Sequence, residues 1–154
     1  CNAGIYPDKS ENLADGYPAR IWNNTFATNV TGTFLTVQAL LPSLQAAVAE
    51  GVPARIAIIA SQMGASARAA GGSFAYRASK AAQINLARNL AADLAGLGIA
   101  VGVYHPGWGR TGMGGPGAAL SPEESAAGLV ARFDELTLET TGCFRNWDGS
   151  DHPF

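Results

Sequence analysis

Tyr76 and Lys80 are the residues of this chain whose types and spacing best suit proton-transfer chemistry. Residues four positions apart share one face of a helix, so the phenol and the ammonium are expected to lie one turn from each other. A cation about 4 Å from a phenolate, at an effective dielectric constant near 20, stabilises the phenolate by about 4 kcal/mol, or roughly three pKa units below a starting value near 10. The pair therefore predicts a tyrosine general acid/base near neutral pH. The alternative is an amphipathic helix that carries a tyrosine and a lysine at its edge.

Two short apolar segments flank this helix and are predicted to be buried strands. They are residues 55–61 and 99–104, with a helix over about 74–97 between them. Continuous apolar runs of this length are typical of strands in a parallel sheet, and strand, helix, strand is one βαβ crossover. Ligands of such sheets bind outside the carboxyl ends of the strands. Ser61 and Tyr76 are therefore expected at one crevice, with a serine that merely ends a strand as the alternative for Ser61.

The rest of the chain divides into helices and loops. Residues 5–22 have the composition of a loop, and apolar residues at three- and four-residue steps predict a helix over about 24–50, which Pro42 should kink. Ser121 begins a further predicted helix with an N-cap, a proline and a capping-box glutamate. Residues 141–147 are predicted to form a short edge strand.

Composition excludes several classes of function. The chain has 154 residues, 47% of them hydrophobic, which fits one domain or a piece of one with a packed core. A net charge of -2 offers no basic face, so we expect no nucleic-acid partner. Apolar runs such as 56–60 are too short to span a bilayer, so we also expect no membrane association. Two cysteines, Cys1 and Cys143, and two histidines, His105 and His152, do not make a metal site at suitable spacing.

Five motifs in chain order resemble those of the short-chain dehydrogenases/reductases, and they span the whole chain. They are Asn2-Ala3-Gly4, Asn29-Val30, Ser61, Tyr76-x-x-x-Lys80 and Pro106-Gly107-Trp108-Gly109-Arg110-Thr111. Residues 61–64, 76–80, 107–115 and 148–153 further resemble the C-factor-like subgroup of that family. The resemblance implies an α/β fold with a Rossmann-type doubly wound parallel sheet. Residues 1–154 would be a single domain, the C-terminal two-thirds of the NAD(P)-binding domain.

The same resemblance implies an activity and roles for individual residues. The chain would belong to an oxidoreductase that interconverts a carbonyl and a secondary alcohol with NAD or NADP as cofactor. Tyr76 would exchange the proton, Lys80 would lower the pKa of Tyr76 and hold the nicotinamide ribose, and Ser61 would hydrogen-bond the substrate oxygen. Asn29 would anchor a water that links Lys80 to solvent; without the family, it would be a polar residue on an exposed helix face. The residues implied in cofactor binding are Asn2, Ala3, Gly4, Tyr76, Lys80, Pro106, Gly107 and Thr111.

The sequence also departs from the family pattern. Gly109 stands where the family usually has valine or isoleucine, and the interval from Ser61 to Tyr76 is longer than is common. Residues 112–117 match the spacing of a phosphate-binding loop but lack its strand-turn-helix context, so we interpret them as part of a mobile substrate lid. The family's glycine-rich loop is missing ahead of Cys1. We therefore expect an N-terminally truncated chain, with roughly 80 residues upstream as two to three βα units.

Three expectations concern the setting of the protein. The two long helices, 24–50 and 74–97, are expected to form the interface of a homo-oligomer, as the resemblance implies. A cytoplasmic location is expected, although the cysteines do not decide it. The rival to an enzyme is a noncatalytic binding or intercellular signalling protein on the same scaffold, because fold does not fix function.

Overall fold

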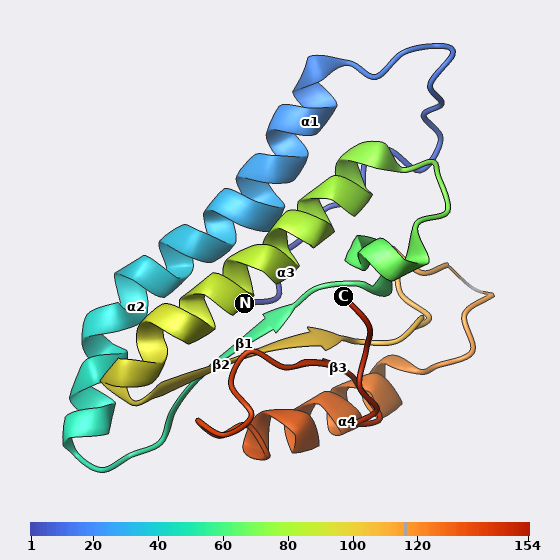
Figure 1. Ribbon diagram of the computed structural model, residues 1–154. Helices are drawn as coiled ribbons and strands as arrows, with labels where there is room; N and C mark the ends of the chain where they lie inside the picture. Colours follow the sequence, from blue (N-terminus) through green and yellow to red (C-terminus); the bar gives the residue numbers. More distant parts are fainter. Residues whose placement is uncertain (116) are drawn as a thin grey trace.

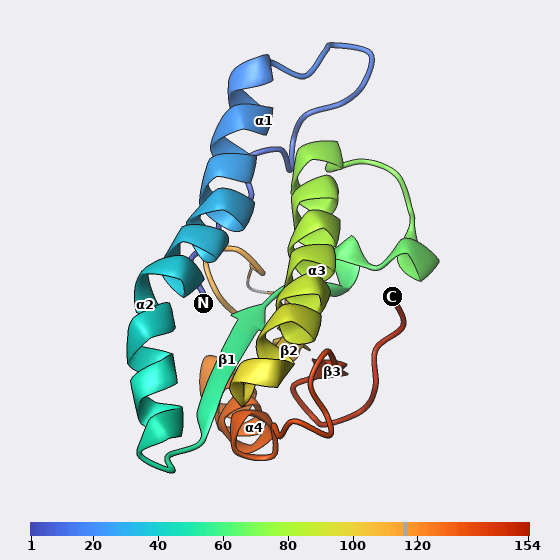
Figure 2. The ribbon, with the colours of Figure 1, turned by 60° about the vertical axis from the view of Figure 1, so that its left-hand side comes forward.

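Three parallel strands lie between two layers of helices (Figure 1). The computed structural model describes residues 1–115 and 117–154. Strand β1 (Ala54–Ile59) pairs with β2 (Ile99–His105), which pairs with β3 (Phe144–Asn146). Helices α2 (Gly32–Ala49) and α3 (Phe74–Leu94) cover one face, with α1 (Ala19–Phe26) packed on α3, and α4 (Pro122–Asp134) covers the other face (Figures 1 and 2). This arrangement confirms the predicted α/β fold with a parallel sheet.

The first long helix begins earlier than the sequence suggests. We expected a loop up to residue 22, but α1 starts at Ala19, directly after Pro18, because its first turns bury Ile21 and Thr25. The helix also continues through Pro42 to Ala49. Its irregular turn lies at Ala27–Thr31, where the hydrogen bonding is that of a π-helix, a feature often found at functional sites.

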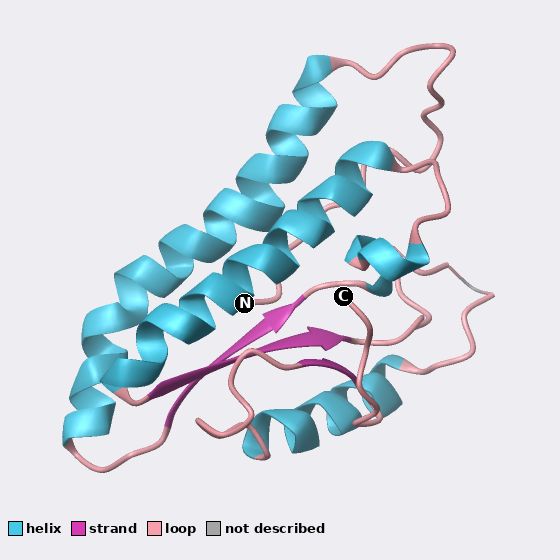
Figure 3. Cartoon of the chain, in the orientation of Figure 1, coloured by secondary structure: helices cyan, strands magenta, loops and turns pink. Residues whose placement is uncertain are grey.

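The helix α3 and the strands beside it confirm the predicted βαβ unit. Helix α3 spans Phe74–Leu94, a 3-10 turn over Ala95–Leu97 extends it, and it packs against β2, every residue of which is buried. The expected edge strand is shorter than its predicted span of 141–147, since β3 covers only Phe144–Asn146. Figure 3 shows that the three strands run in one direction, so their carboxyl ends share one edge.

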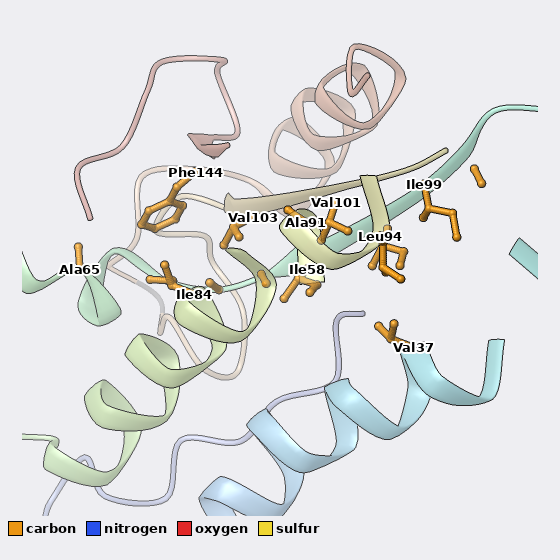
Figure 4. Packing of buried hydrophobic residues seen from close by; sticks show 14 residues of the cluster. Val37, Ile58, Ala65, Ile84, Ala91, Leu94, Ile99, Val101, Val103 and Phe144 are labelled. Carbon is orange, nitrogen blue, oxygen red and sulfur yellow. The ribbon is translucent and has the colours of Figure 1, made fainter. Parts of the chain in front are cut away.

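The core lies between the sheet and the two long helices. Figure 4 shows apolar side chains of α2 and α3 pointing toward those of the strands. The buried cluster includes Val37, Ile58, Ile84, Ala91, Leu94, Ile99, Val101, Val103 and Phe144. Burial of such side chains contributes roughly 1.5–3 kcal/mol each relative to exposure, which fixes α3 on the sheet and with it the residues near its head.

The first residues of the chain run along the outer edge of β1. The amide of Ile59 donates to the carbonyl of Cys1 at 2.9 Å, and the amino group of Cys1 donates to the carbonyl of Ala57 at 2.7 Å. These bonds place residues 2–4 beyond the carboxyl end of β1. The N-terminal motif thereby reaches the edge of the sheet where ligands of parallel sheets bind.

Candidate active site

Ser61 follows β1 and lies at the head of α3. Its backbone is extended, and its hydroxyl accepts a hydrogen bond from the amide of Met63 at 3.2 Å, which starts a 3-10 turn over Gln62–Gly64. This turn packs directly on α3: a Cβ built on Gly64 would lie 2.5 Å from the carbonyl carbon of Lys80. Only a glycine fits there without movement of the backbone, and the close approach brings Ser61 toward the helix.

Tyr76 lies in the first turn of α3 and is 5% exposed. Burial raises the pKa of its phenol, because the charged form loses its water. The neighbouring Ser61 hydroxyl opposes this rise, while the charge of Asp8 and the phenol of Tyr6 add to it. The expectation that Lys80 holds this pKa below its ordinary value is therefore wrong for the structure described here. Tyr76 is a protonated phenol at neutral pH.

Lys80 has hydrogen-bond partners other than Tyr76. Its ammonium donates to the carbonyl of Ile59 at 3.1 Å and to the Oε1 of Gln83 at 2.9 Å, and lies 5.8 Å from the centroid of the Tyr76 ring. One partner lies on β1 and the other on α3 itself. Burial lowers the pKa of Lys80 to about 8. A lysine ammonium has three donors, so one N–H remains for a ligand.

Asn29 is fully buried and connects three parts of the site. Its Oδ1 accepts from the amide of Ile5 at 2.8 Å, and its Nδ2 donates to the carbonyl of Ile5 at 3.0 Å and to Ser79 Oγ at 2.9 Å. The exposed-helix alternative for Asn29 is therefore wrong. Both the oxygen and the nitrogen of the side-chain amide are hydrogen-bonded to protein groups. The π-helical turn that carries Asn29 places this side chain beside α3.

The Asn2-Ala3-Gly4 motif borders Lys80 and Asn29. A Cβ built on Gly4 would lie 3.5 Å from Asn29 Oδ1 and 3.6 Å from Lys80 Nζ. Asn2 and Ala3 are exposed. Of the three predicted cofactor residues in this motif, Gly4 therefore lies beside the lysine ammonium, and Asn2 and Ala3 precede it on the exposed side.

The segment after β2 forms a loop that reaches Tyr76. Gly107 has φ +79° and sits against Leu120 and Trp147, so it suits the turn that Pro106 begins. Further on, the Tyr76 hydroxyl contacts Met113 Sδ at 3.8 Å. The loop thus contacts the phenol through Met113. The interpretation of residues 112–117 as a mobile lid stays a prediction, and residue 116 lies outside the described residues.

Thr111, another predicted cofactor residue, lies on the exposed part of this loop. Its Oγ1 accepts from the amide of Gly114 at 3.0 Å. Arg110, whose role the sequence left open, donates to the carbonyls of Ala118 and Ala119 and so ties the two ends of the loop together. Thr111 is not brought next to Lys80 by any contact among the described residues.

Sequence reasoning missed several residues of the site. The ring of Tyr6 stacks on Tyr76 with 4.0 Å between centroids, and Asp8 accepts hydrogen bonds from the first amides of α3. Gln83 could have been found, because it lies three positions after Lys80 on the same helix face. Tyr6 and Asp8 carry no such signal, since they reach α3 from a loop nearly 70 residues earlier.

The two histidines are buried near the end of β2. The rings of His105 and His152 meet edge to face, 5.9 Å apart, and burial together with His152 lowers the pKa of His105 to about 4. Among residues 1–115 and 117–154, no group of three or more histidine, cysteine or acidic residues lies close enough to hold a metal ion.

Known proteins resemble this chain in sequence. A family model for the short chain dehydrogenases matches residues 1–119. The "C-signal" protein of Myxococcus xanthus is 37% identical over 131 residues, which are 84% of this chain and 76% of that protein.

Solved structures agree in fold. Carbonyl reductase Sniffer of D. melanogaster superposes with a TM-score of 0.91 at 31% identity, over 99% of this chain and 64% of that chain. An NADPH-bound carbonyl reductase from chicken fatty liver superposes with a TM-score of 0.90 at 30% identity, again over 99% and 64%. The chain therefore spans a little under two-thirds of the length of these two reductases.

Proposed function

The chain belongs to the short-chain dehydrogenase/reductase family, and from this premise we propose that the whole protein is an NAD(P)-dependent oxidoreductase that interconverts a carbonyl compound and a secondary alcohol. The observation that carries the proposal is the meeting of Ser61, Tyr76 and Lys80 at the carboxyl end of β1. A protonated phenol, a hydroxyl and a buried ammonium at one edge of a parallel sheet suit acid-base chemistry on an oxygen atom.

The residues beside Lys80 fit a nicotinamide cofactor. Gly4 leaves open the space that a Cβ would fill next to the lysine ammonium, and exposed Asn2 and Ala3 continue this surface. We propose that these residues, with Tyr76, Pro106, Gly107 and Thr111, hold NAD or NADP. When bound, the cofactor supplies or accepts the hydride. The NADPH in the chicken reductase supports this assignment by likeness.

Tyr76 is in the protonation state that carbonyl reduction requires at neutral pH. Because burial keeps the phenol protonated, Tyr76 holds the proton that a carbonyl oxygen needs as it becomes a hydroxyl. Ser61 would donate a hydrogen bond to the same oxygen. Asn29 would keep α3 and the segment around Gly4 in a fixed relative position through its hydrogen bonds to Ser79 and Ile5. The test is consumption of NADH or NADPH by the whole protein with a panel of ketones and aldehydes. The absence of any turnover would refute the proposal.

Cofactor affinity is expected to fall as the pH rises through about 8, the pKa that burial gives Lys80. The sign follows from the charge: below this pH the ammonium donates hydrogen bonds, and above it the neutral amine has lost one donor and its charge. Fluorescence titration of the reduced cofactor over a pH series measures the effect. In Lys80→Arg the step should vanish, because a guanidinium stays charged. Lys80→Ala should weaken cofactor binding and lower the rate of turnover. If the cofactor affinity of the unsubstituted protein did not change with pH, the proposed role of Lys80 in cofactor binding would be contradicted.

A second candidate function is a noncatalytic signalling protein on the same scaffold. The likeness to a protein named "C-signal" is the observation that favours it. Turnover of carbonyl compounds with the reduced cofactor distinguishes the two candidates. A purely signalling protein would turn over no carbonyl compound, whether or not it binds the cofactor.

The exposed face of the first long helix supports a proposal on assembly. Among the described residues, the helical segment Ala19–Ala49 is long and apolar enough to cross a membrane by length and composition alone, and most of it is not buried. Phe34, Leu35 and Leu40 are exposed on it. We propose that a second copy of the chain covers this face, with α2 and α3 forming the interface.

Leu35→Glu is expected to convert this assembly to monomers, because a carboxylate in the interface loses its water without a partner. Sedimentation of the whole protein at micromolar concentration measures the change. Leu35 is 54% exposed, and Val130 on α4 is 56% exposed, so Val130→Glu is a matched control that should leave the assembly intact. A monomeric unsubstituted protein would contradict the proposal, as would its flotation with phosphatidylcholine vesicles.

A further inference from the structure

We propose that residues 6–8 form a clamp that positions the proton donor, with Asp8 and Tyr6 as positioning residues for Tyr76. This inference rests on the proposed function, in which Tyr76 exchanges the proton. The clamp is the segment Tyr6-Pro7-Asp8, which lies one residue after the Asn2-Ala3-Gly4 segment assigned to the cofactor and contacts the head of α3.

Asp8 supplies the N-terminal cap of α3 from a distant part of the chain. Its carboxylate is 0% exposed, and Oδ2 accepts hydrogen bonds from the amides of Ala75 at 2.9 Å and Tyr76 at 3.2 Å. Ser73, at the position where a cap normally comes from, has φ +46° and makes no capping hydrogen bond. The first amides of a helix need such a partner, so α3 depends on Asp8 for the placement of its first turn.

Tyr6 fixes the plane of the Tyr76 ring. The two rings are 4.0 Å apart at an interplanar angle of 18°, and the Tyr6 hydroxyl shares a hydrogen bond with Ser73 Oγ. A stacked ring limits the swing of its partner about the Cα–Cβ bond, the rotation that displaces the phenol oxygen. The phenol oxygen of Tyr76 is therefore held in one direction before substrate arrives.

The clamp is tied to the proposed cofactor side through Ile5. Asn29 accepts from the amide of Ile5 and donates to its carbonyl, and also donates to Ser79 on α3. Gly4, which borders Lys80, is thus four residues from a carboxylate that caps the helix of Tyr76. Movement of the cofactor turn would move the phenol with it.

Asp8 also has an electrostatic effect that a neutral cap would lack. The groups that face Tyr76 are Ser61 from the turn after β1, Tyr6 and Asp8 from the clamp, Lys80 one helical turn on, and Met113 from the loop. The charge of Asp8 raises the pKa of Tyr76 and helps to keep the phenol protonated. Its second oxygen, Oδ1, is buried and has no hydrogen-bond partner among the described residues.

Asp8→Asn separates the two roles of this side chain in the whole protein. The amide oxygen can still accept the two backbone hydrogen bonds, but the charge is gone. We expect turnover within about threefold of the unsubstituted protein near neutral pH and a pH–rate profile whose Tyr76 limb moves to lower pH. Asp8→Ala removes the cap as well, and should lower kcat by about 10- to 100-fold with a smaller effect on KM, because the phenol is misplaced.

A spectroscopic titration keeps this test independent of turnover. The ultraviolet absorbance of tyrosinate, taken as the difference between each protein and its own Tyr76→Phe partner, reports the Tyr76 pKa directly. Asp8→Asn should lower this pKa, and Tyr6→Leu, which removes the stacked phenol, should lower it too. An unchanged titration and pH profile in Asp8→Asn would overturn the inference, as would equal activity of Asp8→Asn and Asp8→Ala. If no carbonyl compound is turned over, the proposed function fails and the titration still decides the clamp.

Discussion

Tyr76→Phe is expected to lower carbonyl reduction by about 10²- to 10⁴-fold, the usual contribution of a positioned acid or base. The benzene ring of phenylalanine keeps the stack on Tyr6 and the burial of the original side chain. Only the hydroxyl that carries the proton is lost. Cofactor affinity should change little, because the Lys80 ammonium keeps its bonds to Ile59 and Gln83. Steady-state rates and cofactor fluorescence measure the two effects separately.

Tyr17→Phe is the matched control for this variant. The Tyr17 hydroxyl also lies near the head of α3, where it accepts from the amide of Phe74 at 3.5 Å and donates to the carbonyl of Glu11. Removal of this hydroxyl should leave turnover almost unchanged. Activity of Tyr76→Phe comparable to that of Tyr17→Phe would contradict the assignment of Tyr76 as the proton donor.

The pairing of Tyr76 and Lys80 could be read from the sequence, but their electrostatics could not. Spacing along a helix is a local property, so it predicts that both residues share one face. The pKa of each group depends on what else the fold places nearby. Burial by other segments raises the pKa of Tyr76, and the Lys80 ammonium donates a hydrogen bond to the carbonyl of Ile59. Neither effect can be predicted from the residues next to Tyr76 and Lys80 in the sequence.

Some helix boundaries follow from the local sequence, and others depend on contacts with distant parts of the chain. The start of α4 at Pro122 follows from a local capping box, which the structure confirms. The first turn of α3 is capped by Asp8, 67 positions before Ala75, and the sequence around Ser73 does not reveal this partner. The early start of α1 at Ala19 likewise depends on the burial of Ile21, which is a property of the folded chain. Strand β2 was predictable because burial on both faces leaves a continuous apolar run. Strand β1 has the same kind of run, but only alternate residues of it are fully buried.

Gly64→Ala is expected to separate Ser61 from Tyr76 and to destabilise the fold. A methyl group at this position would lie 2.5 Å from the carbonyl carbon of Lys80 and 2.7 Å from the amide nitrogen of Ala81, both backbone atoms that cannot rotate away. The φ of Gly64 is not positive, so the space beside α3, and not the backbone conformation, requires the glycine. We expect a loss of about 1–3 kcal/mol in the free energy of unfolding, the usual cost of overpacking.

The loss of activity in Gly64→Ala should exceed its loss of stability, because the turn that carries Ser61 must move off the helix that carries Tyr76. A displacement of about 1 Å in a catalytic group lowers rates by up to about 100-fold, so kcat should fall even at temperatures where the protein remains folded. Denaturant unfolding and steady-state kinetics on the same preparation measure both quantities. Gly96→Ala is the matched control, since it has the same chemical change, no positive φ and no heavy atom within 4 Å of the new methyl group among the described residues. If the two variants were equally stable and equally active, the close contact between the Ser61 turn and α3 would not be what holds the serine beside the phenol.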